Sequence, residues 1–346
     1  MEKTKIISRE ELESKNIITL KELLNSNIPE QEWYVENLIP KRGVTLIAGK
    51  PKEFKSFLAM YLTCCLAGNK DFLNLKIKKS KVMYIDEEND DTELKRRFEK
   101  LKPELDINDE DTENVGLVIF KGIKVNTEQG VNKLKILINL FKPNVIIVDS
   151  LIRVFEGDEN SSKDMKTIFN NIKELMKKYD TTWVILHHVR KMNNKWVKME
   201  DIRGSGDIVA QASSILTVNR NNSNTFTLTQ EAVRGLPQPI SPIQFSAQDI
   251  PINGKWAIKI VYLGRPQREL TTVEAAERDI ENWLTNKQQN SIFKSGQIYK
   301  ALEDKNGRNS LLDGLKRLER KGIIECVNKN AGKWRLKPFN HLTPIV

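Results

Sequence analysis

A lysine-rich segment that begins with glycine and ends with serine has the composition of a phosphate-binding loop. It follows an apolar run at residues 44–48, a predicted strand, and it precedes a segment of helical period. Backbone N–H groups at the start of a helix attract phosphate, a lysine reaches the outer phosphates, and a serine hydroxyl binds magnesium. We therefore expect a phosphate and Mg²⁺ site in the loop made of Gly49, Lys50, Pro51, Lys52, Glu53, Phe54, Lys55 and Ser56.

One position of this loop departs from the motif G-x-x-x-x-G-K-[ST]. Phe54 stands where the motif has its second glycine. A side chain is sterically admissible there only if the backbone angle φ stays negative, so we expect a loop of altered shape. Lys50 and Lys52 add positive charge that partly compensates for the change.

Acidic side chains end two other predicted strands. Asp149 follows an apolar run, where it can hold magnesium through water or cap the next element, and the upstream loop favours magnesium. Asp86, Glu87 and Glu88 follow another run. One of these carboxylates can polarise an attacking water as a general base, or all three form a solvated acidic turn.

Two of the three histidines in the chain are adjacent at the end of a further predicted strand. His188 is predicted to hydrogen-bond a terminal phosphate and to report its presence to the next loop, whereas the alternative is a structural histidine. His187 is predicted to be structural. Metal binding by this pair is not expected, because no further histidine or cysteine partners accompany it.

Short apolar runs alternate with longer segments of helical period from residue 43 to about residue 218. This alternation predicts an α/β fold in which a mostly parallel sheet carries helices on its faces. Ligands of such sheets bind beyond the carboxyl ends of the strands, where the polar residues above lie. After residue 212 the strand-like runs lack long helices and are expected to extend the sheet as antiparallel strands. This domain is assigned to residues 36–265.

The two ends of the chain have different patterns. Residues 1–35 are polar and charged, and the spacing of Leu20, Leu23 and Leu24 predicts a short N-terminal helical arm. Residues 270–346 show three helical patterns followed by a possible hairpin, which predicts a small winged-helix domain. From residue 271 onward, 14 basic and 9 acidic residues give a net charge of +5, half of the total.

The third helix of this C-terminal domain is predicted to be amphipathic. Its apolar stripe, expected to pack inward, consists of Leu311, Leu312, Leu315 and Leu318. Its basic residues are Arg308, Lys316, Arg317, Arg320 and Lys321. A helix with a buried stripe and a basic outer face is what a helix-turn-helix presents to DNA, and the alternative is a solvated helix of a protein-interaction module.

Composition narrows the class of protein. The 346 residues carry a formal charge of +10, which favours an anionic partner such as nucleic acid. No apolar run reaches the roughly 18–20 residues that cross a bilayer, and no signal peptide is recognisable, so we expect a cytoplasmic protein without a membrane partner. The three cysteines suggest neither a disulfide framework nor a zinc site.

Over roughly residues 30–265, the motifs above resemble those of the RecA-like ATPases, and most closely the RepA-type hexameric helicases of plasmids, phages and mobile elements. The resemblance depends on the joint occurrence, in family order, of WYVENLIPKRGVTLIAG, KPKEFKS, YIDEEN, VIIVDS, ILHHVRK and IRGSGDI. It implies ATP as the ligand and Mg²⁺ as the cofactor, with Lys55 and Ser56 on the phosphates and the metal and Asp149 on the metal.

The same resemblance implies roles for further residues. Glu88 corresponds to the catalytic base, with Glu87 as the runner-up, and His188 to the phosphate sensor. Family members form rings, commonly hexamers, in which an arginine of the neighbour completes the site, and the segment TLTQEAVRG makes Arg234 the counterpart of that arginine. Ala232 stands where the family often has a lysine.

DNA contacts in this family come from two loops that follow strands. The first corresponds to FEGDENSSKD, which is acidic and poorly suited to phosphate. The second contains basic residues around an aromatic one, a combination that suits single-stranded DNA through phosphate attraction and base stacking, and the alternative is a solvated loop without a ligand. Its predicted contacts are Arg190, Lys191, Lys195, Trp196, Lys198 and Arg203.

The leading hypothesis is a ring-forming ATPase that translocates on single-stranded DNA, as a replicative helicase of a mobile element does, with duplex binding by the C-terminal domain. A recombinase or recombination mediator is the first alternative, since it shares the ATPase core but forms filaments. The second is an ATP-gated DNA-binding regulator that hydrolyses ATP weakly, which Phe54 and Ala232 would favour.

Overall fold

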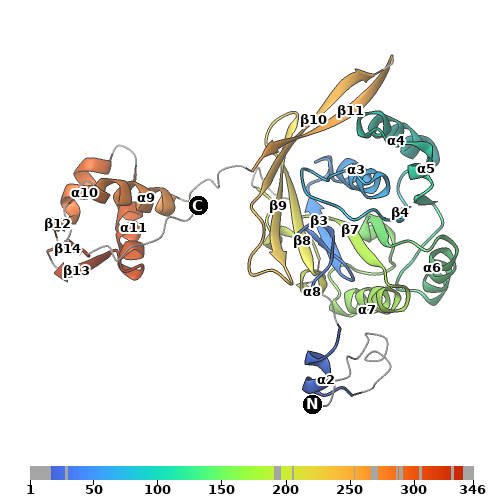
Figure 1. Cartoon of the computed structure of the whole chain (residues 1–346), viewed down its shortest axis with the longest axis horizontal. Coiled ribbons are helices and arrows are strands. Elements are labelled where there is room, and N and C mark those ends of the chain that lie inside the picture. Colours follow the sequence, from blue (N-terminus) through green and yellow to red (C-terminus); the bar gives the residue numbers. More distant parts are fainter. Residues whose placement is uncertain are drawn as a thin grey trace, which may run out of the picture. The chain divides into compact units, whose positions relative to one another are not determined.

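The protein divides into two compact units, Met1–Pro266 and Gln267–Val346 (Figure 1). The computed structural model describes residues 17–27, 30–190, 196–204, 206–252, 254–265, 272–285, 287, 291–303, 306–328 and 331–337. None of the helices in these ranges is both long enough and apolar enough to span a membrane.

A nine-stranded sheet organises the described part of the first unit, in the order β11-β10-β9-β8-β3-β7-β6-β4-β5 (Figure 1). The strands from β8 to β5 are parallel to one another and β9, β10 and β11 are antiparallel, so the predicted α/β fold of the RecA-like type is confirmed. The parallel strands are β3 (Val44–Gly49), β4 (Val82–Asp86), β5 (Val115–Ile119), β6 (Val145–Asp149), β7 (Thr182–His188) and β8 (Ser214–Arg220). The antiparallel strands are β9 (Thr225–Val233), β10 (Ile243–Ile252) and β11 (Lys255–Gly264).

Strand β8 differs from the prediction. We expected antiparallel strands from residue 212 onward, but β8 pairs parallel with β3. The connection from β7 to β8, which includes the short helix α8 (Gly206–Gln211), is long enough to return the chain to the starting edge of the sheet. Antiparallel pairing begins with β9, which a short connection joins to β8.

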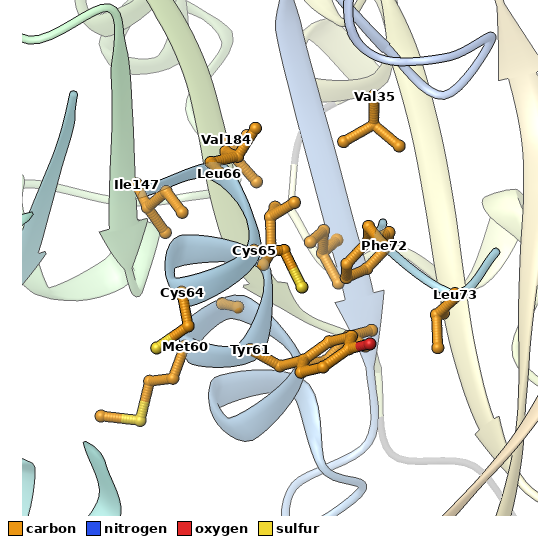
Figure 2. Packing of buried hydrophobic residues seen from close by; sticks show 14 of the residues in the cluster. Val35, Met60, Tyr61, Cys64, Cys65, Leu66, Phe72, Leu73, Ile147 and Val184 are labelled. Carbon is orange, nitrogen blue, oxygen red and sulfur yellow. The ribbon is translucent and has the colours of Figure 1, made fainter. Parts of the chain in front are cut away.

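Helices cover both faces of the sheet because neighbouring residues of each strand point to opposite sides. Ile147 and Val184 belong to one apolar cluster with Leu66 of helix α3 (Figure 2), whereas Ile146 and Ile185 belong to a second cluster on the other face. The first cluster involves α3 (Lys55–Gly68) and α4 (Asp91–Leu105), with α5 (Asp109–Thr112) beside α3. The second involves α6 (Glu128–Phe141), α7 (Ser162–Tyr179) and α8. This double covering explains why the parallel strands are continuous apolar runs.

Helix α3 is buried over almost its whole length, and it starts at the phosphate loop. Cys64 and Cys65 of this helix belong to the first apolar cluster (Figure 2). Burial raises the pKa of both thiols, that of Cys64 to about 12. Both cysteines are free. A helix that is apolar on all sides has little freedom to shift, which anchors the loop at its N-terminus.

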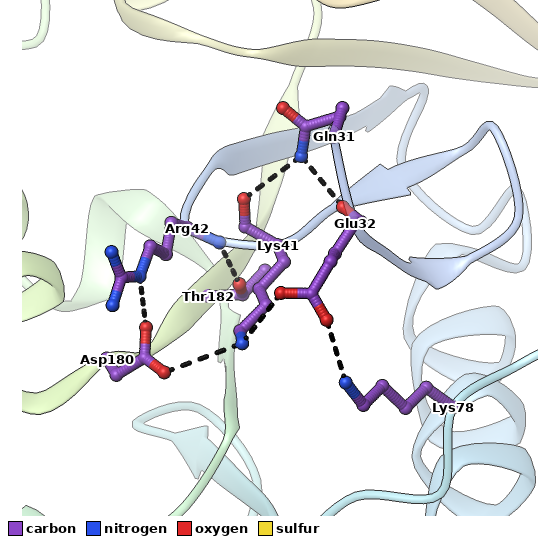
Figure 3. Close-up of polar contacts among 7 residues, drawn as sticks. All are labelled: Gln31, Glu32, Lys41, Arg42, Lys78, Asp180 and Thr182. Carbon is purple, nitrogen blue, oxygen red and sulfur yellow. Dashed lines mark hydrogen bonds and ion pairs between the residues drawn. The ribbon is translucent and has the colours of Figure 1, made fainter. Parts of the chain in front are cut away.

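A polar network holds the hairpin of β1 (Trp33–Val35) and β2 (Ile39–Pro40) against the start of β7 (Figure 3). Lys41 Nζ lies 3.0 Å from Glu32 Oε2 and 3.6 Å from Asp180 Oδ2, and Arg42 also pairs with Asp180. The backbone N–H of Arg42 donates to the hydroxyl of Thr182 at 2.7 Å. The network therefore fixes the chain just before β3.

The N-terminal arm contains one described helix, α2 (Leu20–Leu24), and its residues 1–16 lie outside the described ranges. Thr19 caps this helix in a capping box with Glu22. None of its residues is buried, so the apolar stripe that predicted the helix has no covering partner among the described residues.

The second unit has its own core. Within its described ranges it contains α9 (Thr272–Thr285), β12 (Ile292–Lys294), α10 (Ser295–Leu302), α11 (Arg308–Arg320), β13 (Ile324–Asn328) and β14 (Lys333–Leu336). Strand β14 lies between β12 and β13 in an antiparallel sheet. Leu311, Leu315 and Leu318 of α11 are buried, but Leu312, which we expected to pack inward, is 39% exposed. It follows Leu311 directly and so points about 100° away from the buried stripe.

Candidate nucleotide-binding site

The register of the parallel sheet brings the predicted site residues together. Gly49 at the end of β3 lies opposite His188 of β7, and Asp86 of β4 lies opposite Asp149 of β6. A pocket of about 520 Å³ opens beyond these strand ends. Its lining includes Pro51, Lys52, Glu53, Phe54, Lys55, Ser56, Glu88, Asp149, Ser150 and His188.

Lys55 is held inside the phosphate loop. Its Nζ donates to the carbonyl oxygens of Gly49 at 2.9 Å and of Lys50 at 2.7 Å. Burial lowers the pKa of Lys55 to about 8, although the carboxylates of Asp149 and Glu53 oppose this shift. A buried ammonium group that bonds only to carbonyl oxygens is poorly neutralised, so an incoming phosphate would gain a strong interaction with it.

Gly49 is required by a close backbone approach. A Cβ atom at this position would lie 2.9 Å from the carbonyl oxygen of Val218 in β8. Any side chain would therefore push the start of the phosphate loop away from the neighbouring strand.

Phe54 adopts the conformation that our sequence analysis excluded. Its φ is +67° and its ψ is 6°, in the left-handed region, so the expectation of a negative φ is wrong. The ring stacks on Phe57, with centroids 5.3 Å apart, and on Phe226, at 4.8 Å. A left-handed residue costs about 1–2 kcal/mol, and each aromatic pair contributes about 0.5–1.5 kcal/mol beyond its burial, so the two stacks offset the strain.

Asp149 is oriented by two hydroxyl groups. Tyr84, fully buried in β4, donates to Asp149 Oδ2 at 2.8 Å, and Ser56 hydrogen-bonds the same carboxylate. Burial raises the pKa of Asp149, and these two hydrogen bonds oppose that shift. Sequence analysis missed Tyr84, because its only signal was a polar atom inside an apolar strand.

The residues around Asp149 fit a nucleotide-bound magnesium ion. No group of three or more His, Cys, Asp or Glu side chains in the described ranges is arranged to hold a metal by itself. Ser56 and Asp149 supply two oxygen donors, and Mg²⁺ commonly takes its other ligands from water and substrate phosphates. The buried hydroxyl of Ser150 and Nδ1 of His188 have no hydrogen-bond partner, and both residues line the pocket, so polar atoms remain for a ligand to satisfy.

The three acidic residues after β4 have different surroundings. Asp86 is fully buried, and its Oδ1 accepts the backbone N–H groups of Glu88 and Asn89 at 2.8 Å. Glu87 accepts three backbone N–H groups of residues 121–123, at 2.9–3.2 Å, and so caps the loop after β5. Of these three residues, Glu88 lines the pocket, whereas the carboxylate of Glu87 is engaged by the backbone after β5.

Among the described residues, Glu88 has one ion-pair partner, and the pair is weak. Its Oε2 lies 3.4 Å from Nε of Arg153, and both side chains are about half exposed. Exposed pairs of this kind contribute roughly 0–1 kcal/mol, so Glu88 can leave Arg153 at little cost. A carboxylate that moves freely at the edge of the phosphate pocket can orient a water molecule there.

The two histidines at the end of β7 occupy different environments. His187 is fully buried, with Nε2 2.7 Å from the carbonyl oxygen of Arg203, and burial lowers its pKa to about 4. His188 lines the pocket, and burial and the charge of Lys55 lower its pKa. Both imidazoles are therefore neutral near pH 7. The contact of His187 with Arg203 fixes the C-terminal end of the loop that follows β7.

Acid is expected to destabilise the fold through His187. The folded protein takes up this proton near pH 4 and the unfolded chain near pH 6.5, so the unfolded state binds more protons between these values and the free energy of unfolding falls as the pH is lowered. Between about pH 6.5 and pH 5 the loss is on the order of 2 kcal/mol.

Urea unfolding at these two pH values would measure the loss. The variant His187→Gln keeps an N–H donor for the carbonyl of Arg203 but does not titrate. We expect its stability to fall less between the two pH values than that of the natural protein. Equal losses in both proteins would contradict the assignment.

A family model described as an AAA domain matches residues 8–194, more than half of the chain. The chain belongs to the AAA domain family. A comparison with curated proteins finds no match for the sequence. The family match supports a P-loop ATPase, in agreement with the position of Lys55 in the loop at the start of α3. Nucleotide binding is therefore expected of this domain.

Next to the nucleotide pocket of this AAA domain lies a wider cleft of about 1080 Å³. Pro51, Glu88 and His188 line both cavities. The cleft is also lined by the basic residues Lys50, Arg153, Arg190 and Arg203. Arg153 was not predicted from the sequence; it ends the short 3₁₀ helix Leu151–Arg153, just before the acidic segment FEGDENSSKD.

The loop after β7 is fixed at both ends. The backbone N–H of Arg190 donates to the carbonyl of Asp201 at 2.9 Å, and the Asn219 side chain clamps the backbone of Val197. Arg203 pairs with the buried Glu159 of the loop after β6, so it is only partly available to an external phosphate. Trp196 is 53% exposed and Lys198 is also exposed, whereas Lys191 and Lys195 lie outside the described residues.

Arg234, the predicted arginine finger, is exposed and does not line the described nucleotide pocket of this chain. Its Nη2 donates to the carbonyl of Ala210 at 2.6 Å, and its backbone N–H donates to Ser213. The side chain therefore lies at the end of β9, where a neighbouring molecule can reach it.

The basic residues of α11 are not equivalent. Arg317 and Lys321 approach the buried Glu277 of α9, at 3.6 and 2.6 Å, and Lys316 pairs with Asp313. The guanidinium of Arg308 lies over the ring of Tyr299. Arg320 is exposed. Part of the basic face predicted for DNA thus also stabilises the packing of α11 on α9.

Proposed function

We propose that this ATPase is a ring-forming motor that uses ATP to move on single-stranded DNA, as a helicase in the replication of a mobile element. One observation carries the proposal: the nucleotide pocket and the basic cleft share Glu88 and His188. A phosphate backbone in the cleft would touch the same residues as the terminal phosphate of ATP, which provides a direct coupling between hydrolysis and grip.

In the proposed mechanism, Lys55 and the N-terminus of α3 bind the β- and γ-phosphates, and Ser56 and Asp149 hold the Mg²⁺. When bound, this ion neutralises charge that develops on the phosphates. Glu88 accepts a proton from the attacking water, and His188 hydrogen-bonds the γ-phosphate. The backbone carbonyl oxygen of His188 accepts the N–H of Arg203 at 3.2 Å, so a movement of the His188 backbone would reach the loop proposed to contact DNA.

The proposal includes a ring, commonly of six copies, in which Arg234 of each subunit completes the site of its neighbour. It also includes a winged-helix role for the second unit, with Arg308 and Arg320 of α11 as duplex contacts. The exposed position of Arg320 and the packing of Leu311, Leu315 and Leu318 support this role. Because these arginines would bind DNA phosphates, the affinity of the second unit for duplex DNA should fall strongly with increasing salt concentration.

Steady-state ATP hydrolysis of the full chain, with and without single-stranded DNA, tests the proposal. We expect a rate that DNA stimulates and that the Lys55→Ala variant abolishes. Tight nucleotide binding without turnover would instead favour the ATP-gated regulator, which Phe54 and Ala232 support. Electron microscopy separates the recombinase, because helical filaments rather than closed rings would favour it.

Replacing Trp196 by alanine is expected to weaken single-stranded DNA binding by about 5- to 150-fold, because stacking of one base is worth about 1–3 kcal/mol. Nucleotide affinity should not change, since Trp196 does not line the nucleotide pocket. The matched control is Trp256→Ala, which removes another exposed tryptophan, on β11. Fluorescence anisotropy of a labelled oligonucleotide measures both variants, and an equal loss in the two would contradict the role of Trp196.

A further inference from the structure

We propose that Phe54 is a positioning residue for nucleotide binding. An aromatic stack, defined here as Phe54, Phe57, Phe226 and Phe245, holds the phosphate loop in its left-handed conformation and links it to strands β9 and β10. The inference rests on nucleotide binding by the loop and not on the DNA partner of the proposed function.

The stack joins the loop to the antiparallel half of the sheet. Phe226 of β9 and Phe245 of β10 are opposite each other in register, their ring centroids are 5.3 Å apart, and both side chains are buried. Phe54 lies 4.8 Å from Phe226 and 6.2 Å from Phe245. The ring of Phe54 thus stacks on the cross-strand pair of Phe226 and Phe245. The strands that carry this pair are hydrogen-bonded to each other in the sheet.

Arg220, which also contacts Phe226, makes a second contact with the phosphate loop. Arg220 of β8 lies opposite Phe226 in register, and its guanidinium stands 4.9 Å above the Phe226 ring. Nη2 of Arg220 donates to the carbonyl oxygen of Lys52 at 3.2 Å. Lys52, with a φ of +63°, is the other non-glycine residue of the loop in the left-handed region. Both left-handed residues of the loop are therefore held by groups that meet at Phe226.

This arrangement differs from ordinary core packing. A glycine at position 54 would reach the same φ without strain and would need no support. A phenylalanine keeps it only while surrounding groups determine it, so weakening the stack should release the loop toward negative φ. Backbone N–H groups of the loop would then point away from the phosphates, and nucleotide affinity would fall although no group that touches the nucleotide has changed.

A double-mutant cycle on the full chain tests the inference, with the affinity for a fluorescent ATP analogue and Mg²⁺ as the readout. Phe226→Leu keeps an apolar side chain but removes the stacked ring. In the natural background we expect it to weaken nucleotide binding by about 2- to 10-fold, the range for one aromatic pair. In the Phe54→Gly background the same change should have an effect of less than about twofold, because glycine holds the left-handed conformation unaided and Arg220 still donates to the carbonyl oxygen of Lys52.

Phe72→Leu is the matched control. Phe72 is buried in the same apolar cluster and packs on Tyr61, away from the stack. It should lower the melting temperature about as much as Phe226→Leu and leave nucleotide affinity unchanged. An equal loss of affinity from Phe226→Leu in both backgrounds, or no loss in either, would overturn the inference. Measurable nucleotide binding without DNA-stimulated turnover would contradict the proposed motor alone.

Discussion

Replacing Glu88 by glutamine is expected to lower ATP turnover by about 10²–10⁴-fold, the usual contribution of a general base, while nucleotide affinity stays within about twofold. Glutamine has the same shape but cannot accept the proton of the attacking water. Glu88 lines the pocket and is held only by the half-exposed pair with Arg153, so its loss leaves no buried charge without a partner. Steady-state hydrolysis and a nucleotide-binding titration separate the two effects.

Glu87→Gln provides the control for this prediction, because the two residues are adjacent and chemically identical. Glu87 caps the backbone N–H groups of residues 121–123, so its replacement should lower the melting temperature and leave turnover largely unchanged. If Glu87→Gln abolished turnover and Glu88→Gln did not, the assignment of the base would be reversed.

Replacing Arg234 by alanine is expected to lower turnover by up to about 10³–10⁵-fold, the range known for arginine fingers supplied in trans. The reason is that Arg234 is exposed and lies outside the described pocket of its own subunit, so it would act on a neighbour. Its loss should not change nucleotide binding by the isolated subunit. Hydrolysis assays at increasing protein concentration would show the effect, since the proposed assembly would bring Arg234 to the neighbouring site.

A mixing experiment identifies action in trans. The Lys55→Ala variant keeps Arg234 but has a defective site, and the Arg234→Ala variant keeps an intact site. Each alone should be nearly inactive, whereas a mixture should regain turnover, because mixed rings of the proposed kind would contain intact sites that face an intact Arg234. Full activity of Arg234→Ala alone, or a mixture that stays inactive although mixed rings form, would be evidence against this role.

Local sequence patterns predicted the elements and most of the site. The alternation of apolar runs with helical segments depends on which faces of each strand and helix are buried. The spacing of apolar residues within each segment reveals those faces. The phosphate loop, Asp149, His188 and the acidic group of residues 86–88 were placed at one edge because each lies at the end of a predicted strand, and parallel strands end at the same edge of a sheet.

The tertiary structure decided the points that depend on contacts between distant segments. The sequence does not distinguish Glu87 from Glu88. In the structure the carboxylate of Glu87 accepts backbone N–H groups of the loop after β5, whereas Glu88 lines the pocket. The support for Phe54 comes from Phe226 and Phe245, about 170 and 190 residues further along the chain. The parallel direction of β8 likewise depends on pairing with β3 and not on its own composition.

The sequence by itself therefore determined the α/β class, the order of the elements and the place of the phosphate loop, because burial periodicity and turn chemistry act over a few residues. The three-dimensional fold decided which carboxylate is available, how a phenylalanine replaces a glycine in the loop, and that Tyr84 orients Asp149. These outcomes depend on which side chains lie within a few ångströms of one another across the sheet, and no local pattern encodes that distance.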